Sequence, residues 1–111
     1  MSDDFSNIKR RKFFKRLLFF ILANLLLPHL PVIFTFIQVC ATDPEHTQAA
    51  LASIVGLLGD LADAFPRGEA KDFFLQPWVA EVLKMSRTRG GTETIRKTAK
   101  WAREMIKRAT V

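Results

Sequence analysis

The clearest pattern in the sequence is a helical period between Glu45 and Phe65. Large apolar residues recur there at steps of three and four, namely Leu51, Ile54, Leu58, Leu61 and Phe65. This spacing places them on one side of an α-helix and predicts that this side packs against other elements. Opposite them runs a narrow stripe of small and acidic residues, Ser53, Gly56, Asp60 and Asp63. Such a helix needs further apolar helices to cover it.

Turn signals on either side set the limits of this helix. Asp43-Pro44 favours a turn, because the residue before a proline disfavours helical backbone. Asp43 can then cap the helix, and Pro44 can take the first position, where its missing N–H costs nothing. A proline-containing turn after Phe65 ends the helix. The segment before it, from Pro31 to about Thr42, has apolar residues at helical spacing and predicts a helix of its own.

A third helix is expected from near Glu69 to about Arg87. It contains Pro77, which cannot donate a backbone hydrogen bond. Either the helix kinks there, or two short helices meet at Gln76-Pro77.

The last helix is expected after Gly90-Gly91, with Thr92 as its N-cap. One side of it carries the apolar residues Ile95, Ala99, Ala102, Ile106 and Ala109. Another side carries a basic stripe of Arg96, Lys100, Arg103 and Lys107. The sequence therefore predicts a helix with one covered side and one strongly charged side.

Two glycines and two tryptophans point to close packing inside these helices. An interior glycine costs a helix about 1 kcal/mol relative to alanine, so Gly56 and Gly59 need a compensating close contact. Trp78 and Trp101 each lie beside an apolar helical face. We expect both indoles in the core.

The fold class that follows is all-α. Four helices joined by short turns make two helical hairpins with a length near 40 residues per pair, which is the period of HEAT or armadillo repeats. The charged last helix suits the cap that ends such a stack. We expect residues 30–111 to form the repeat segment, preceded by an apolar amino-terminal helix within a basic and apolar segment, residues 1–29, of unknown role.

The amino-terminal segment leaves a second interpretation open. Six bases lie between Lys9 and Arg16, and no formal charge occurs from Leu17 to Thr42. Residues 1–41 could therefore act as a signal or anchor in a small membrane-bound or secreted helical protein. Against this, prolines interrupt the apolar run after Leu27, which leaves it shorter than the roughly 20 residues of a spanning helix.

Other function classes find little support in the sequence. No nucleophile lies in a recognisable catalytic setting, so we expect no enzyme. His29 and His46 stand apart from other ligands, and we expect neither a metal nor a cofactor. The basic stripe of the last helix could attract RNA or acidic lipid, but a solubilising cap explains it more simply, and nucleic acid is not favoured.

Three blocks of sequence resemble the importin-β family. They are Leu57-Leu58-Gly59-Asp60-Leu61-Ala62-Asp63-Ala64-Phe65-Pro66, then Gln76-Pro77-Trp78-Val79, then Lys100-Trp101-Ala102-Arg103-Glu104. Their order and separation are similar to the carboxy-terminal HEAT repeats of the fungal-type nuclear import receptor, over about Leu30 to Val111. The resemblance implies the closing helix pairs of a receptor several times longer, at work in the cytoplasm and nucleus and at the nuclear pore.

The resemblance also implies partners. Members of the family bind the basic domain of importin-α or a basic cargo signal on an acidic inner surface. They release it on meeting Ran-GTP, and they contact nucleoporins, but the main Ran and nucleoporin surfaces lie in the amino-terminal half of the receptor. The second helix of each pair lines the inner surface. The resemblance therefore assigns Asp60 and Asp63 to partner binding.

Overall fold

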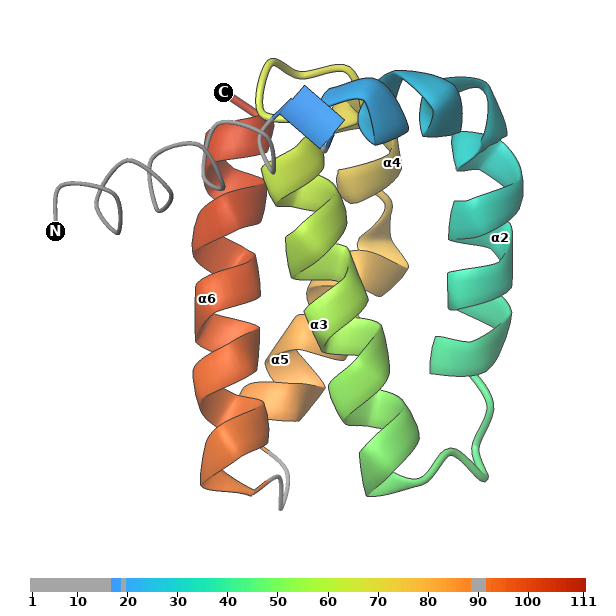
Figure 1. The fold of residues 1–111 in the computed structure, drawn as a ribbon. Helices are drawn as coiled ribbons and strands as arrows, with labels where there is room; N and C mark the ends of the chain where they lie inside the picture. The colour runs from blue at the N-terminus through green and yellow to red at the C-terminus, as the bar shows by residue number, and fades with distance from the viewer. Residues whose placement is uncertain (1–16, 19, 89–91) are drawn as a thin grey trace, which may run out of the picture.

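The computed structural model describes residues 17–18, 20–88 and 92–111, and within these residues the ordered elements are all helical (Figure 1). Residues 20–26 are helical and lead into a short 3-10 helix. The elements that follow are η1 (Leu27–His29), α2 (Leu30–Ala41), α3 (Gln48–Ala64), α4 (Lys71–Phe74), α5 (Pro77–Thr88) and α6 (Glu93–Ala109). The all-α prediction is confirmed.

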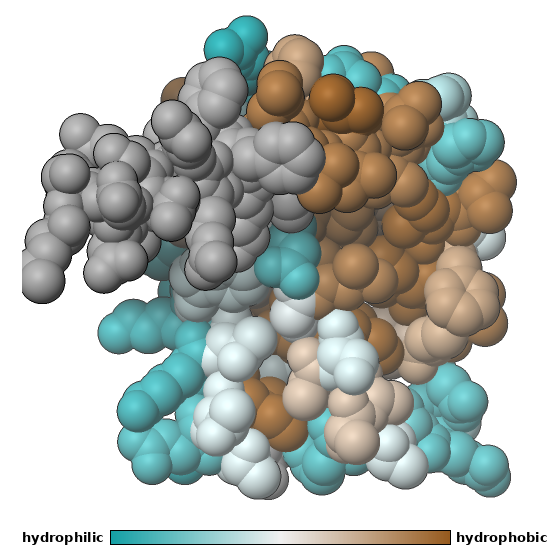
Figure 2. Space-filling model, in the orientation of Figure 1, coloured by the Kyte–Doolittle hydropathy of each residue, from teal (hydrophilic) through white to brown (hydrophobic). Residues whose placement is uncertain are grey.

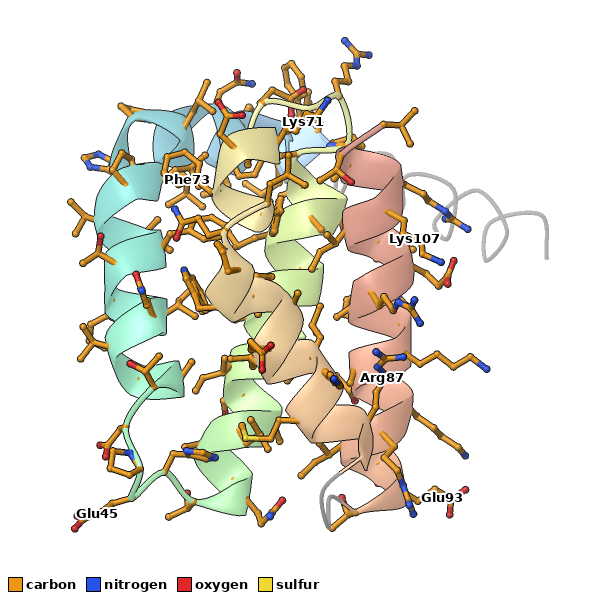
Figure 3. The ribbon with its side chains drawn as sticks, turned by 180° about the vertical axis from the view of Figure 1, so that it is seen from behind. Glu45, Lys71, Phe73, Arg87, Glu93 and Lys107 are labelled. Carbon is orange, nitrogen blue, oxygen red and sulfur yellow. The ribbon has the colours of Figure 1, made fainter. Side chains whose placement is uncertain are left out.

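The helices stack as two pairs in two layers. Helices α3 and α6 lie side by side and run in the same direction, and they share the most extensive helix contact of the described chain (Figure 1). Helix α2 runs antiparallel to α3, and α5 runs antiparallel to α6. Seen from behind, α5 lies across α3 and α6, in a second layer with α2 and α4 (Figure 3). This is the arrangement of two helical hairpins that the sequence predicts.

The periodic residues of α3 form the middle of the core. All five members of the predicted apolar side are buried: Leu51, Ile54, Leu58, Leu61 and Phe65. From α6, Ile95, Ala99, Ala102 and Ala109 are also buried, while Ile106 is partly buried. Because the alanines of α6 are short, its backbone can approach α3 closely.

An aromatic cluster joins α2 to the second pair. The Phe34 ring lies 5.0 Å from the Phe73 ring in a stacked arrangement, and 5.2 Å from the Phe74 ring edge to face. Trp78 lies at 6.4 Å, also edge to face. Since Phe34 is 1% exposed, this cluster is the main packing contact of α2 in the second layer.

The predicted N-cap of α3 is wrong by four residues. Thr47, not Asp43, caps the helix, and its Oγ1 accepts a hydrogen bond of 3.1 Å from the Ala50 N–H. Asp43 instead closes a turn, in which its Oδ1 accepts from the Glu45 N–H at 2.9 Å. Both residue types favour either role, because a short polar side chain bonds to a nearby backbone N–H in caps and turns alike. The end of α2 at Ala41 agrees with the sequence.

Pro77 separates two helices, so the second of the two predicted alternatives, two short helices that meet at Gln76-Pro77, is confirmed. Helix α4 is a single turn, and Pro77 opens α5, where its missing N–H needs no partner. The Trp78 Nε1–H donates a hydrogen bond to the Gln76 Oε1 across the junction. Trp78 is 9% exposed and belongs to the core, as expected.

The prolines of the amino-terminal apolar run do not break its helix, and the expectation that they shorten it is wrong. Helical backbone continues through Pro28 and Pro31, because each proline lies at the first or second position of a new helical segment. Phe20–Ala41 is consequently 22 residues long, and by length and composition alone it could cross a membrane. A helix of this kind near an amino terminus is weak support for a membrane protein.

Thr92 caps α6 as predicted, with its Oγ1 accepting from the Ile95 N–H at 3.2 Å. Two other features fall outside the described residues. They are the Gly90-Gly91 break and the basic cluster from Lys9 to Arg16.

Candidate partner-binding surface

An acidic stripe runs along the side of α3 that faces away from the core. Asp60 and Asp63 are both exposed, and they stand three residues apart, so their carboxylates project from adjacent turns of one helix side. Neither forms an ion pair with any described residue. We use the name acidic stripe for these two residues. The opposite side of α3 is buried in the core, and this packing fixes the position of the two carboxylates.

A close contact between α3 and α6 borders the acidic stripe. Gly59 precedes Asp60, and a side-chain carbon built on it would lie 2.2 Å from Cζ3 of Trp101. The indole of Trp101 therefore rests directly on the backbone of α3, which only glycine permits. A side-chain carbon built on Gly56, one turn earlier, would have nothing within 4 Å. The expected packing role is thus confirmed for Gly59 and wrong for Gly56.

Trp101 is not a core residue. The sequence places it beside the apolar side of α6, but 39% of its surface is exposed. Because Gly59 has no side chain, the ring can pack against the backbone of α3 at this point while part of it stays exposed. The partly exposed indole contacts α3 at Gly59, one residue before Asp60, and an aromatic face attracts cations.

The stripe and Trp101 together fit a basic ligand. A carboxylate accepts hydrogen bonds from ammonium or guanidinium groups, and the exposed indole can take the apolar stem or the charge of the same side chain. The surface position of Trp101 was not predicted; the related signal in the sequence is the interior glycine Gly59, which indicates a close contact but not the residue that makes it.

The basic stripe of α6 is on the surface as predicted. Arg96, Lys100 and Arg103 are exposed, and Lys107 pairs with Glu104 at 3.7 Å on its own helix. Exposed pairs of this kind contribute about 0–1 kcal/mol each. The main effect of these charged side chains is to keep the outer side of the last helix solvated.

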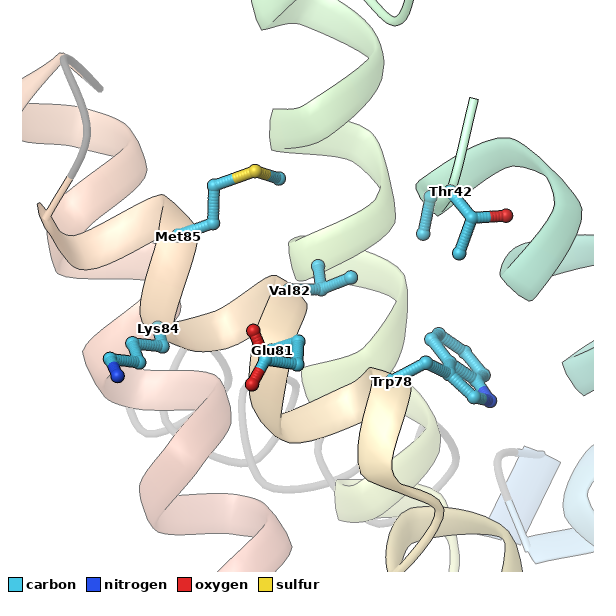
Figure 4. A pocket seen from close by; sticks show the side chains of 7 residues that line it. Thr42, Trp78, Glu81, Val82, Lys84 and Met85 are labelled. Carbon is cyan, nitrogen blue, oxygen red and sulfur yellow. The ribbon is translucent and has the colours of Figure 1, made fainter. Parts of the chain in front are cut away.

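A groove lies in the other layer, between the end of α2 and α5 (Figure 4). Its volume is about 350 Å³, and Trp78, Val82 and Met85 give it an apolar lining beside Glu81. It contains no cysteine, histidine or serine. Among the described residues no group of three metal-ligating side chains occurs.

Comparison with known proteins identifies the relatives of this chain. A family model described as importin subunit beta-1-like, TPR repeats, matches residues 22–87, more than half of the chain. Importin subunit beta-1 of Schizosaccharomyces pombe is 36% identical over 85 residues, and that of Saccharomyces cerevisiae is 42% identical over 88 residues. These matches cover 77% and 75% of this chain. The chain spans about 10% of each relative.

Solved structures agree with the sequence matches. A crystal structure of importin beta superposes with a TM-score of 0.75 at 36% identity, over 79% of this chain and 10% of the other. Yeast importin-beta, Kap95p, superposes with a TM-score of 0.74 at 38% identity, over 78% of this chain and 10% of the other.

The family match begins at residue 22, ahead of Leu30, where the resemblance was expected to start. It therefore includes most of the apolar segment that the membrane interpretation needs, and favours the repeat interpretation. Importin-β relatives are transport receptors and not enzymes. The chain belongs to the importin-β family.

Proposed function

We propose that this chain takes part in protein import into the nucleus by binding a basic segment of a partner on the acidic stripe of α3. The partner is the basic domain of importin-α or a basic cargo signal. Membership in the importin-β family supports a role in nucleocytoplasmic transport, and with it a location in the cytoplasm and nucleus. The single observation that carries the proposal is the pair of exposed carboxylates, Asp60 and Asp63, which form no ion pair with any described residue and follow Gly59, the residue of α3 that contacts the partly exposed indole of Trp101.

Charge supports this surface over others. Residues 17–83 carry seven acids and two bases, whereas residues 84–111 carry two acids and nine bases. A basic ligand is therefore repelled from the outer side of α6 and attracted to α3. Opposite charges also increase the rate of encounter, and selectivity for lysine- and arginine-rich segments follows from the same field.

Yeast relatives have been solved with other partners, Kap95p with RanGDP and Kap95 with Nup1. Ran and nucleoporins are therefore partners within the family. Because this chain spans about a tenth of those relatives, we propose for it only the basic segment, with the nuclear pore as the place where the receptor acts.

Neutralising the acidic stripe tests the proposal. We expect Asp60→Asn with Asp63→Asn to weaken binding of a labelled importin-α basic domain by roughly 3- to 10-fold in fluorescence anisotropy. Each exposed pair contributes about 0–1 kcal/mol, and 1.4 kcal/mol corresponds to a factor of 10.

A matched control removes the same two charges elsewhere. Glu69→Gln with Asp72→Asn changes two exposed acids in and near α4 and should alter the affinity by less than about 2-fold. Equal losses in the two double variants would show that net charge, and not the acidic stripe, attracts the ligand. No measurable binding by the unaltered chain would end the proposal.

A further inference from the structure

The helix at residues 20–26 is apolar on nearly all sides, yet little of it is covered. Between residues 17 and 29 of the described chain, only Ala23 is buried, at 7%. Ile21 and Leu25 stand two residues before and after Ala23, so in a helix of about 3.6 residues per turn they point away from the stack. A helix that is apolar all round is normally buried in a protein core or in a membrane. Its large apolar side chains are instead exposed by 37% to 64% of their surface: Phe20, Ile21, Leu22, Leu25 and Leu26.

The polar side chain of this helix bonds to the helix itself. The Nδ2 of Asn24 donates a hydrogen bond of 2.9 Å to the backbone oxygen of Phe20, one turn earlier. An amide that is bonded in this way loses less on leaving water than a free one. No formal charge occurs between Leu17 and Thr42. The helix can therefore enter an apolar medium without burying a charge.

The helix lies across one end of the stack. Figure 1 shows it running over the end at which α3 and α6 finish. Figure 2, in the same orientation, shows apolar side chains gathered at this end of the molecule. A flat surface that approaches the stack from this end would meet the helix along its length. This position suits a helix that rests on a surface.

Six bases directly precede the apolar segment in sequence, all of them between Lys9 and Arg16. An apolar helix next to a basic cluster is typical of segments that bind anionic bilayers, where the apolar side chains enter between the headgroups and the bases attract anionic lipid. We propose that residues 9–27 attach the chain to an anionic membrane surface, with the helix lying in the plane of the interface. This activity is separate from the acidic stripe and does not rest on it.

The packing of α2 decides between lying in the membrane and crossing it. Phe20–Ala41 could span a bilayer by length and composition. However, α2 forms its second half, and Phe34 holds α2 in the stack through its contacts with Phe73 and Phe74. Residues 17–29 as a helix would measure about 20 Å, against about 30 Å for the hydrocarbon core. The free part is therefore too short to cross.

Family coverage and charge weigh against a protein occupant. The family match begins at residue 22, so the bases as well as Leu17, Leu18, Phe20 and Ile21 lie ahead of it. A second copy of the chain on this helix would bring two clusters of six bases close together. Like charges repel, whereas an anionic lipid surface attracts both the bases and the apolar side chains.

Co-sedimentation of the full chain with vesicles tests the inference. We expect binding to vesicles of phosphatidylserine and phosphatidylcholine in equal amounts to be at least about 10-fold tighter than to phosphatidylcholine alone. Ile21→Ser with Leu25→Ser should weaken it by at least about 10-fold, since the burial of one such side chain corresponds to about that factor. Both residues are exposed, so the variant should keep its helical circular dichroism and its melting temperature.

Matched variants separate this segment from general charge. Arg10→Gln with Arg11→Gln should weaken vesicle binding by roughly 10-fold, because each base near an anionic surface adds to the attraction. Arg96→Gln with Arg103→Gln removes the same charge from the outer side of α6 and should change binding by less than about 2-fold.

An apolar control addresses non-specific adhesion. Leu75→Ser with Val111→Ser removes two apolar side chains elsewhere, at 59% and 100% exposure, and should leave vesicle binding unchanged.

Four outcomes would overturn the inference. They are no binding to phosphatidylserine vesicles, equal binding to both kinds of vesicle, equal losses in the two arginine variants, and retention in the bilayer after alkaline carbonate extraction, which would indicate a spanning helix. Binding of the importin-α basic domain is measured separately through Asp60 and Asp63, so either proposal can fail while the other holds.

Discussion

Phe34→Ala is expected to remove a large part of the stability of the fold. The side chain is 1% exposed and its ring contacts the rings of Phe73, Phe74 and Trp78. Truncating a buried phenylalanine costs about 3–5 kcal/mol, whereas small domains unfold at about 5–15 kcal/mol in total. Urea denaturation followed by circular dichroism should show a large fall in the midpoint.

Phe36→Ala is the matched control, because the same residue type two positions along the same helix is 68% exposed. It should change the free energy of unfolding by less than about 0.5 kcal/mol. If both variants lost stability equally, α2 would not be oriented as described. If neither did, the aromatic cluster would not hold α2 to the second pair.

Gly59→Ala and Gly56→Ala are expected to change stability in opposite directions. At Gly59 the added methyl group would overlap the Trp101 ring and displace it, at a cost of about 1–3 kcal/mol from overpacking. At Gly56 there is open space, so alanine should stabilise α3 by up to about 1 kcal/mol through its higher helix propensity. Thermal unfolding of the two variants measures both effects.

Trp101 provides an internal check on this prediction. In Gly59→Ala combined with Trp101→Ala, the overlap no longer exists, so the two changes should be strongly non-additive. Additive losses would mean that the cost at Gly59 arises elsewhere. Stabilisation by alanine at both glycines would contradict the close contact of α3 and α6.

Helix periodicity predicted much of this fold because the core consists of the apolar sides of amphipathic helices, and the spacing of apolar residues reveals those sides. The apolar side of α3 and the alanine-rich side of α6 are buried as their spacing indicates. Thr92 was recognisable as the N-cap of α6 because a threonine hydroxyl can accept a hydrogen bond from a backbone N–H of the first turn, and it does so here. Helix boundaries were less predictable. Asp43 and Thr47 both suit an N-cap, and the choice between them depends on how α2 and α3 meet, which no local rule specifies.

The candidate surface was only half predictable. Asp60 and Asp63 could be assigned from the family resemblance, and their exposure agrees with a surface role that is still to be tested. The contribution of Trp101 depends on a contact between residues 42 positions apart, Gly59 and Trp101, and pattern within one helix cannot reveal it. The exposure of Val32, Phe36 and Val39 on α2 was likewise hidden, because a helix that is apolar on two sides looks fully buried in sequence.

Hydrogen exchange of the full chain, with and without the importin-α basic domain, tests the central claim most directly. We predict slower amide exchange in α3 around Asp60 and Asp63 and in α6 around Trp101, with α2 and α4 unchanged, because the ligand should lie across the layer that α3 and α6 form. Protection confined to α2, α4 and α5, or no protection at a saturating concentration of the basic domain, would contradict the account.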